Sequence, residues 1–405
     1  MKIWRTPYPK FGAGPGLERV RKVADVLGID LAAFGESGAV IVGSNGKGST
    51  AAMCAALLQG AGRSVGLFTS PHLLQLNERF RGDGADIDDA ALGIHWDRVI
   101  AAVDKAGFAK ELGGFEFLFL IAASWFAERG FDHTIWEAGI GGRLDPVRLI
   151  RAKHVALTSL DLEHTELLGS TIEEIGLDKL DAAPPGSSVF APLGLQGHET
   201  FARACAKRGV DYQTIAPWRD AALPLSGAHQ QQNAALALSL ATALTQIEAD
   251  ALAPGFARTR WPGRLEVLER EPFLVIDVGH TPEGVRAALA GFEQMAQGRP
   301  RTLVCGVSRD KQAEPIIAAL APHFPRIVCA AAHHKGAPAG EIAKLAAAAN
   351  SEAEISLAES VSEARRLAVA SAGKDGAIYV AGGLFLAAEL KAAHLGLDPD
   401  ALAFF

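Results

Sequence analysis

Phosphate binding is the first chemistry that the residue types suggest, because residues 43–50 read Gly-Ser-Asn-Gly-Lys-Gly-Ser-Thr. The backbone N–H groups of such a loop, with the N-terminus of a following helix, suit phosphate oxygens. Lys47 would reach the terminal phosphates of a nucleotide, and Ser49 or Thr50 could hold magnesium. Gly48 separates the lysine from the hydroxyl residue, so the spelling differs from the usual P-loop, and a plain glycine-rich turn is the alternative. We predict nucleotide contacts at Asn45, Gly46, Lys47, Gly48, Ser49 and Thr50.

A carboxylate and an imidazole follow two other apolar runs. Glu137 ends the run 132–136, and an acid at the carboxyl edge of a sheet can face phosphates and bind Mg²⁺. His164 follows the run 154–159 and could be a neutral metal ligand or a capping residue in a loop. Taken alone, Glu137 could also be a strand-end charge that faces solvent. Because the strand ends near 43, 137 and 161–164 should converge on one sheet edge, we predict that these groups share one site.

Polar residues in the second half of the chain offer further nucleotide contacts. Residues 229–235 read His-Gln-Gln-Gln-Asn-Ala-Ala ahead of an apolar helix, where amides such as that of Asn233 can bond nucleotide atoms or cap the helix. Arg264 follows a Pro-Gly break and is a candidate clamp on a phosphate. Asp277 could bond ribose hydroxyls and His280 a phosphate, with solvated strand-end polar groups as the alternative.

Lys179 lies among acids in the helical pattern Gly-Leu-Asp-Lys-Leu-Asp at residues 176–181. A lysine beside acids on a helix normally forms a solvated surface pair. From the residues alone we therefore expect Lys179 to have no role in catalysis.

The elements that must position these groups alternate along the chain. Strands are expected at residues 39–42, 64–68, 132–136 and 154–159, with helices at 49–60 and 115–128. This rhythm is typical of a parallel sheet covered on both faces. A helix at 233–244 and the Pro262-Gly263 break precede a second α/β series, with strands at 273–277, 302–306, 327–330 and 377–381. The sequence therefore predicts two α/β domains, at residues 1–262 and 263–405.

Composition narrows the class of protein. The 405 residues carry a formal net charge of −7, which argues against nucleic acid or an anionic membrane as the main partner. The four cysteines form no CxxC pair, so we expect buried structural thiols in a reducing compartment. Residues 1–7 lack the apolar core of a signal peptide, and no uncharged apolar stretch reaches 18 residues. We expect a cytoplasmic enzyme with no membrane span.

Taken in order, the segments resemble the folylpolyglutamate synthase/dihydrofolate synthase family of the Mur ligase superfamily. A single motif of this kind is weak, but so many in one order across nearly the whole chain are specific. The matching segments are residues 16–20, 43–50, 69–73, 77–79, 137–145, 163–169, 229–233, 262–264, 277–280, 310–311 and 382–386.

The resemblance implies an N-terminal P-loop-type domain with a mainly parallel sheet, a smaller Rossmann-like C-terminal domain, and a monomer. It implies ATP-dependent addition of glutamate to a carboxylate acceptor, dihydropteroate or a folate, through an acyl phosphate. By similarity, two Mg²⁺ ions would be held by Ser49, Ser70, Glu137, His164 and Lys179. Nucleotide contacts would also come from Asn233, Arg264 and Asp277, and the catalytic set would be Lys47, His164, Lys179, Arg264 and His280.

The resemblance also changes the interpretation of Lys179. In the family the lysine at this place is often carbamylated by CO₂, which turns an ammonium into a carboxylate that can hold the second magnesium. The family pattern around it is usually Gly-x-Glu-Lys-Ala-Gly, so here the lysine is kept while its neighbours differ.

Other departures lie near the acceptor and amino-acid sites. Residues 146–148 read Pro-Val-Arg where the family commonly has Ala-Thr-Asn, Glu163 replaces an aspartate, Thr281 replaces an asparagine, and Lys335 stands where an arginine is frequent. These changes keep a second interpretation open, in which a divergent ligase of the same mechanism adds glutamate or a related amino acid to a non-folate acceptor. A nucleotide-binding, catalytically silent interaction protein is a third.

Overall fold

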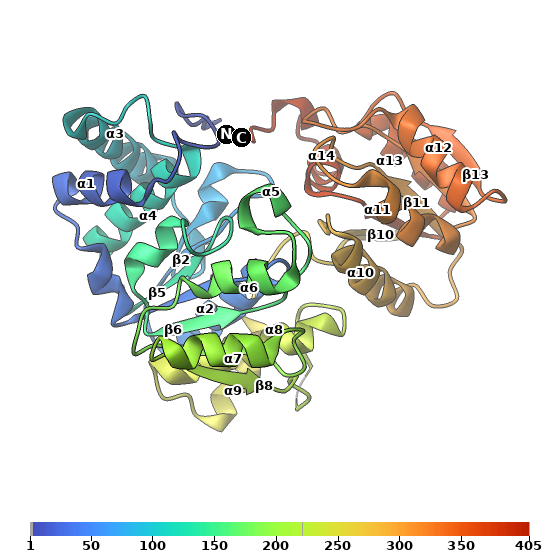
Figure 1. The fold of residues 1–405 in the computed structure, drawn as a ribbon. Helices are drawn as coiled ribbons and strands as arrows, with labels where there is room; N and C mark the ends of the chain where they lie inside the picture. Colours follow the sequence, from blue (N-terminus) through green and yellow to red (C-terminus); the bar gives the residue numbers. More distant parts are fainter. Residues whose placement is uncertain (1–2, 221, 405) are drawn as a thin grey trace.

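The chain forms two α/β units, each built around its own sheet (Figure 1). The computed structural model describes residues 3–220 and 222–404. In the first unit eight strands run in the order β4-β3-β2-β5-β1-β6-β7-β8. Their bounds are β1 Gly38–Val42, β2 Val65–Phe68, β3 Phe80–Gly82, β4 Ala85–Asp86, β5 His133–Glu137, β6 His154–Leu157, β7 Ser188–Pro192 and β8 Asp211–Ile215.

Neighbouring strands are parallel along the part β2-β5-β1-β6-β7-β8 of this order. At one edge β3 pairs antiparallel with β2, and β4 pairs antiparallel with β3. The helices of this unit are α1 Leu17–Leu27, α2 Lys47–Gly60, α3 Asp89–Ala106, α4 Gly114–Arg129, α5 Thr165–Leu168, α6 Ile172–Leu180, α7 His198–Lys207, α8 His229–Leu244 and α9 Ala249–Ala257. Short 3₁₀ turns lie at Leu31–Gly35, Leu76–Arg79 and Pro146–Ile150.

Strand β1 shows why both faces of this sheet are covered. All five of its residues are buried, and successive side chains point to opposite faces. Val40 and Val42 join the core beneath α1, α3 and α4, while Ala39 and Ile41 join the core beneath α2, α8 and α9. A central parallel strand buried on both sides reads as a continuous apolar run, as residues 39–42 do.

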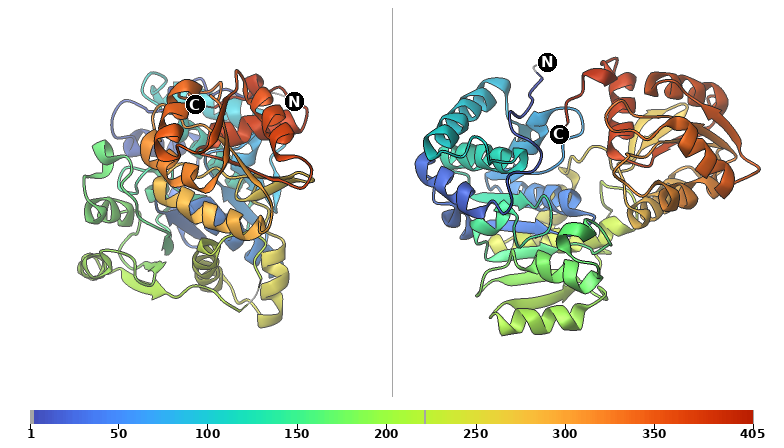
Figure 2. Two further views of the ribbon diagram at one scale, coloured as in Figure 1. Left: turned by 90° about the vertical axis from the view of Figure 1, so that its right-hand side faces the viewer. Right: turned by 45° about the horizontal axis from the view of Figure 1, so that its top comes forward.

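The second unit has six strands in the order β13-β12-β11-β14-β10-β9. Their bounds are β9 Glu266–Arg270, β10 Phe273–Ile276, β11 Arg301–Cys305, β12 Arg326–Cys329, β13 Glu354–Leu357 and β14 Ala377–Ala381. The helices are α10 Pro282–Met295, α11 Ala313–Leu320, α12 Ala339–Ala349, α13 Val361–Ala372 and α14 Leu384–His394, followed by the 3₁₀ turn Pro399–Ala401. All pairs are parallel except β9 with β10. Figure 2 shows this smaller unit beside the first.

The predicted fold class, a mainly parallel N-terminal sheet with a smaller α/β unit after it, is confirmed. The predicted strands and helices appear within a few residues of their expected bounds, with one exception. Residues 229–232 form the first turn of α8 and do not precede the helix. The polar run is itself helical, and Gln230 within it is buried. The antiparallel strands β3, β4 and β9 were not predicted, because each is short or lacks a clear apolar run, and neither were the parallel strands β7, β8 and β13.

The division at residues 262 and 263 falls between α9 and β9 and stays a prediction. Within the described residues, no helix combines the length and apolar character that crossing a membrane requires. The four cysteines are buried free thiols, as expected.

Candidate active site

A cavity of about 880 Å³ lies between the two units. From the first unit it is lined by the phosphate loop after β1, the loop after β2, Glu137 after β5 and the segment that begins at Glu163 after β6. From the second unit it is lined by Arg264, His280 and the loops around Lys311 and Lys335. Because β5, β1 and β6 are neighbours in the sheet, their carboxyl ends meet at one edge, as the sequence predicted.

The phosphate loop is closed on itself and on the end of β6. Gly46, with φ of 86°, is the N-cap of α2, and the helix begins at Lys47. The Lys47 Nζ donates to the carbonyl oxygens of Gly43 at 2.8 Å and Ser44 at 3.2 Å. The backbone N–H of Asn45 donates to Ser159 Oγ at 2.8 Å, so the loop is anchored to the end of the neighbouring strand. Backbone N–H groups at a helix start are therefore held in place for an anion.

Two hydroxyl residues follow in the first turn of α2. Ser49 and Thr50 are both buried, and Gly48 packs so closely under the indole ring of Trp261 that an added Cβ would lie 2.3 Å from it. No described atom forms a hydrogen bond with Thr50 Oγ1. A buried hydroxyl without a partner costs free energy, so a phosphate or metal-bound oxygen here would satisfy it.

Glu137 and Ser70 meet at the end of β5. Glu137 is 4% exposed, and one of its oxygens accepts from the Ser70 N–H at 2.9 Å. Burial raises the pKa of Glu137, and the nearby cations Lys47, Arg264 and Arg79 oppose that shift. A carboxylate that lines the cavity offers the kind of oxygen ligand that a divalent cation takes.

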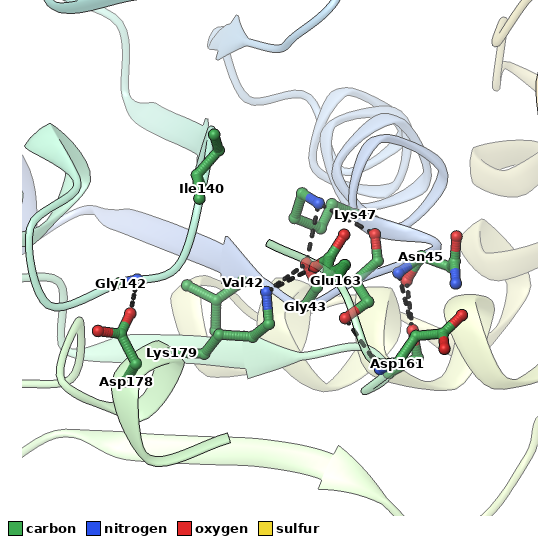
Figure 3. A network of polar contacts seen from close by, with 12 residues as sticks. Val42, Gly43, Asn45, Lys47, Ile140, Gly142, Asp161, Glu163, Asp178 and Lys179 are labelled. Carbon is green, nitrogen blue, oxygen red and sulfur yellow. Dashed lines mark hydrogen bonds and ion pairs between the residues drawn. The ribbon is translucent and has the colours of Figure 1, made fainter. Parts of the chain in front are cut away.

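Lys179 is not on the surface, so the expectation of a solvated pair is wrong. It is 1% exposed, and α6 turns this face toward the phosphate loop. Its Nζ donates to Glu163 Oε1 at 2.9 Å and to the Gly43 carbonyl at 3.2 Å (Figure 3). The neighbouring Asp178 is also buried and accepts from the Gly142 N–H, which fastens the loop after β5 to the same helix. Periodicity over one short helix did not reveal that Asp178 and Lys179 face inward, whereas Asp181 stays partly exposed and pairs with Arg208.

The charges of this buried pair differ from those of free side chains. Burial lowers the pKa of Lys179, although Glu163 opposes that shift. Burial alone would raise the pKa of Glu163, but Lys47 and Lys179, with hydrogen bonds, lower it to about 2. Glu163 is therefore a carboxylate at neutral pH.

His164 is the residue after this carboxylate and lines the cavity. It has φ of 45° and is the N-cap of α5. Burial is the main cause that lowers its pKa, so the imidazole is neutral near pH 7 and suited to bind a metal.

The second unit contributes Arg264 and His280. Arg264 Nε is buried and has no hydrogen-bond partner among the described residues. Burial, with Lys311 and Arg264 nearby, lowers the pKa of His280 to about 4. A buried guanidinium donor aimed at the cavity fits an anionic group there.

Asp277 and Thr281 hold the backbone around these two residues. The Asp277 carboxylate accepts from the N–H groups of Gly279 at 2.7 Å and Leu265 at 3.1 Å, so it fixes the turn beside Arg264. Its predicted ribose contact stays a prediction. Thr281 Oγ1 caps α10 and accepts from Asn45 Nδ2 at 3.0 Å, which joins the second unit to the phosphate loop.

Asn233, in the first turns of α8, lies directly beside the phosphate loop. A Cβ on Gly46 would lie 2.4 Å from Asn233 Oδ1, and Asn233 Nδ2 donates to Gln230 Oε1 at 2.9 Å. The predicted nucleotide residues of the two halves of the chain therefore come together around one loop.

The residues present fit a metal that takes part of its shell from the substrate. No group of three or more His, Cys, Asp or Glu side chains suited to a metal occurs in residues 3–220 and 222–404. The predicted ligands Glu137, His164, Ser49 and Ser70 would together offer a mixed oxygen and nitrogen donor set, and all but Ser49 line the cavity. Magnesium usually binds through one or two carboxylates together with phosphates and water, which agrees with so few protein ligands.

Phe115 and Asp145 are among the cavity-wall residues that sequence reasoning did not single out. Phe115 packs its ring against Gly139, where an added Cβ would lie 2.8 Å from the ring. Asp145 is buried, accepts from the N–H groups of Gly139 and Ile140, and has its pKa raised by burial to about 6. Only the glycine-rich spelling of 139–142 hinted at a close approach of backbone and side chain here.

Comparison with known proteins identifies the family. Residues 263–384 match the family described as Mur ligase, glutamate ligase domain. The dihydrofolate synthase/folylpolyglutamate synthase of Bacillus subtilis is 30% identical over 354 residues, which cover 78% of this chain and 81% of that protein. A probable bifunctional folylpolyglutamate synthase/dihydropteroate synthase of Halobacterium salinarum is 32% identical over 94% of this chain. The chain spans about half the length of that relative and of its Haloferax volcanii counterpart.

Solved structures agree over nearly the whole length. The folylpolyglutamate synthase of Mycobacterium tuberculosis complexed with ADP has a TM-score of 0.88 at 26% identity and covers 96% of both chains. Escherichia coli FolC in complex with DHPP and ADP has a TM-score of 0.86 at 26% identity and covers 96% of this chain and 95% of that one. The chain therefore belongs to the folylpolyglutamate synthase/dihydrofolate synthase family of Mur-type ATP-dependent ligases.

Proposed function

We propose that this chain is an ADP-forming carboxylate–amine ligase that adds glutamate to dihydropteroate, to a reduced folate, or to both. The observation that carries the proposal is the set of groups around one cavity: the phosphate loop, Glu137 with Ser70, and the buried pair Lys179–Glu163 on one side, and Arg264 with His280 on the other. The related FolC binds DHPP and ADP, and a further structure of the family holds Mn, AMPPNP and L-glutamate.

The reaction needs charge neutralisation more than covalent help from the protein. An oxygen of the acceptor carboxylate attacks the γ-phosphorus of ATP, the bond to ADP breaks, and an acyl phosphate forms. The glutamate amine then attacks the acyl carbon, loses a proton, and inorganic phosphate leaves. Lys47, released from the carbonyls of its own loop, would neutralise the β- and γ-phosphates, and Arg264 would approach from the opposite wall.

Metal binding is assigned by the donor set. Ser49, Ser70, Glu137, His164 and a carbamylated Lys179 would hold two Mg²⁺ ions, which supply charge neutralisation at the transferring phosphoryl group. Carbamylation joins the neutral Lys179 amine to CO₂ and releases one proton, and the lowered pKa of this buried amine favours that neutral form. The carbamate and Glu163 would then be two anions within reach of one cation, which removes their mutual repulsion.

Apolar side chains in the cavity wall suit a flat acceptor ring. Phe115, Ile140, Leu144 and Pro146 all line the cavity, and the Phe115 ring packs against Gly139, two residues after Glu137. Pro146 starts a 3₁₀ turn in this wall and stands at one of the positions that departs from the family pattern. That departure is the reason to keep a divergent acceptor as the second candidate.

Incorporation of labelled glutamate tests the proposal. Purified protein is supplied with ATP, Mg²⁺ and either dihydropteroate or tetrahydrofolate, and ADP release is followed in parallel. We expect incorporation with at least one acceptor, and none with Lys47→Ala, whose circular dichroism should match the wild type. Nucleotide binding without incorporation on either acceptor would reject the folate assignment in favour of the divergent ligase. Activity of Lys47→Ala would reject the role of the phosphate loop.

A further inference from the structure

The last described residues of the chain leave the second unit and reach the first (Figures 1 and 2). Asp398 caps the short turn Pro399–Ala401, and Leu402, 7% exposed, is part of the core beneath α13 and α14. Ala403 and Phe404 then extend toward the loop that follows β2. We call residues 402–404 the tail and residues 69–79 the β2 loop.

His72 of the β2 loop is where the tail makes contact. Its ring stacks on Phe404 with centroids 5.3 Å apart and an interplanar angle of 7°. Its Nε2 lies 2.8 Å from the Ala403 carbonyl oxygen, and its Nδ1 lies 2.9 Å from Arg79 Nε. A guanidinium can only donate, so Nδ1 accepts and the ring proton is on Nε2, from which it donates to Ala403. His72 and Arg79 are 3% and 2% exposed, so both contacts are shielded from water.

Hydrogen bonds within the β2 loop join its residues to one another. The Glu78 carboxylate accepts from the N–H groups of Leu73, Leu74 and Gln75 at 2.7 to 2.9 Å. The Thr69 N–H donates to the Arg79 carbonyl and closes the loop. Because Ser70 lies two residues before His72 and donates to Glu137, a shift of the loop at His72 moves the groups that we assign to magnesium.

Phe404 is also packed against residues of the second unit. The Phe404 ring packs against Phe385 at 4.8 Å and against His334 at 5.2 Å, between ring centroids. Buried Glu389 of α14 accepts from the N–H groups of His333 and His334, which fixes the loop that carries His334. The tail is therefore fixed to the second unit at Leu402 and by its aromatic neighbours.

We propose that the tail is a strap that couples the position of the second unit to the β2 loop, with Phe404 and His72 as positioning residues for the ligase reaction. The chain of contacts runs from the C-terminal core through Phe404 and Ala403 to His72, and along the β2 loop to Ser70 and Glu137. Both side chains line the cavity. In the role proposed here they act through Ser70 and Glu137, which they keep in register with Arg264 and His280 across the cavity. The catalytic part of this inference rests on the proposed function.

Steady-state kinetics of tail variants test the strap. For Phe404→Ala and for the chain ending at Leu402, we expect kcat to fall about tenfold to a hundredfold, as a small misplacement of reacting groups does. The KM for ATP should stay near the wild-type value, since the described contacts of the tail run to the β2 loop and the second unit. Phe404→Tyr keeps the stacked ring and should restore kcat. Leu395→Ala, an exposed position in the same C-terminal segment, is the matched control and should change nothing.

A double mutant separates coupling from general loss of structure. His72→Gln keeps a donor for Ala403 but loses the ring that stacks on Phe404 and the acceptor at the Nδ1 position that Arg79 uses, so kcat should fall here as well. If the two residues act through one contact, the double variant with Phe404→Ala should be no worse than the more damaged single variant. Wild-type kcat in Phe404→Ala and in the shortened chain, or fully additive losses, would overturn the strap.

Hydrogen exchange gives a readout that does not need the reaction. The N–H groups of Leu73, Leu74 and Gln75 should exchange faster in Phe404→Ala than in the wild type, and at the wild-type rate in Leu395→Ala. If the wild type incorporates no glutamate, the proposed function fails, and exchange in the β2 loop alone decides on the strap. Exchange that is unchanged by Phe404→Ala would then reject it.

Discussion

Lys179 shows how one buried side chain changes the chemistry available to the molecule. On the surface its amine would stay protonated, whereas at 1% exposure it lies against the phosphate loop and pairs with Glu163. Burial lowers the pKa of the amine and so raises the neutral fraction that can react with CO₂. A buried ion pair gains little net stability, because removing both charges from water costs free energy. The burial of Lys179 is therefore better explained by a role in binding a ligand than by a contribution to stability.

Replacing Lys179 by alanine is expected to remove nearly all turnover without unfolding the protein. A short carboxylate such as acetate should partly restore the rate, because it can occupy the space of the carbamate and supply its charge. The measurement is kcat with and without added carboxylate, with Lys153→Ala, an exposed lysine, as control. A fully active Lys179→Ala in the absence of carboxylate would reject the carbamate.

His229 and His280 should make stability depend on pH. Burial is the main cause that lowers both pKa values to about 4 in the folded chain, from 6.5 for the free side chain. Below pH 6.5 the unfolded chain therefore binds protons that the folded chain does not. The contribution of these two histidines to the free energy of unfolding is fully present above pH 6.5 and is lost as the pH falls toward 4. Urea unfolding between pH 7.5 and 5 should show this loss.

When the wild type unfolds near pH 5, each of the two histidines should take up about one proton. Replacing both by glutamine should remove this uptake of about two protons and so flatten the dependence of stability on pH. Asp145, whose pKa is raised to about 6, contributes with the opposite sign, but equally in both proteins, so it cancels in the comparison. An identical pH slope for the double variant and the wild type would contradict the assignment.

At the scale of the element, the phosphate loop depends on Gly46 for two reasons: its backbone conformation and the lack of room for a side chain. Gly46 has φ of 86° as the N-cap of α2, a conformation that costs an L-residue about 1–2 kcal/mol. A Cβ would also lie 2.4 Å from Asn233 Oδ1. The glycine therefore lets α8 approach the loop as well as making the turn.

Gly46→Ala is expected to weaken ADP binding at least about tenfold, which corresponds to 1.4 kcal/mol, because Asn233 or the loop must shift. The matched control is Gly62→Ala, which has φ of 77° and open space around the added Cβ, and should cost only backbone strain. Calorimetric titration with ADP measures the difference. Equal affinities in the two variants would show that the contact with Asn233 does not matter.

At the scale of the whole molecule, the site exists only between two units. The phosphate loop belongs to the first and Arg264 and His280 to the second, and the hydrogen bond from Asn45 to Thr281 already joins them. Closure around a nucleotide would exclude water from an acyl phosphate, which water would otherwise hydrolyse.

A non-hydrolysable ATP analogue with Mg²⁺ should therefore slow amide hydrogen exchange on both sides of the cavity together. The segments to compare are residues 43–50 and 277–284, with strand β13 at the far edge of the second sheet as the internal reference. Protection confined to residues 43–50 would contradict a nucleotide held between the units.

The sequence by itself determined what depends on local rules. A continuous apolar run at 39–42 followed by Gly-Ser-Asn-Gly-Lys-Gly-Ser-Thr specifies a buried strand, a turn with positive φ and a helix start, since each follows from residues a few positions apart. The alternation of strands and helices placed Glu137 and His164 on the same sheet edge as Lys47, because parallel strands end together.

Only the tertiary structure decided which side chains meet across long separations. Lys179 reaches Gly43, Asn45 reaches Thr281, and His72 reaches Ala403, and no periodicity links residues more than a hundred positions apart. Burial is the physical reason that these contacts matter: it removes water from the Lys179–Glu163 pair and shields His72, and it follows from how the helices and the two units pack together.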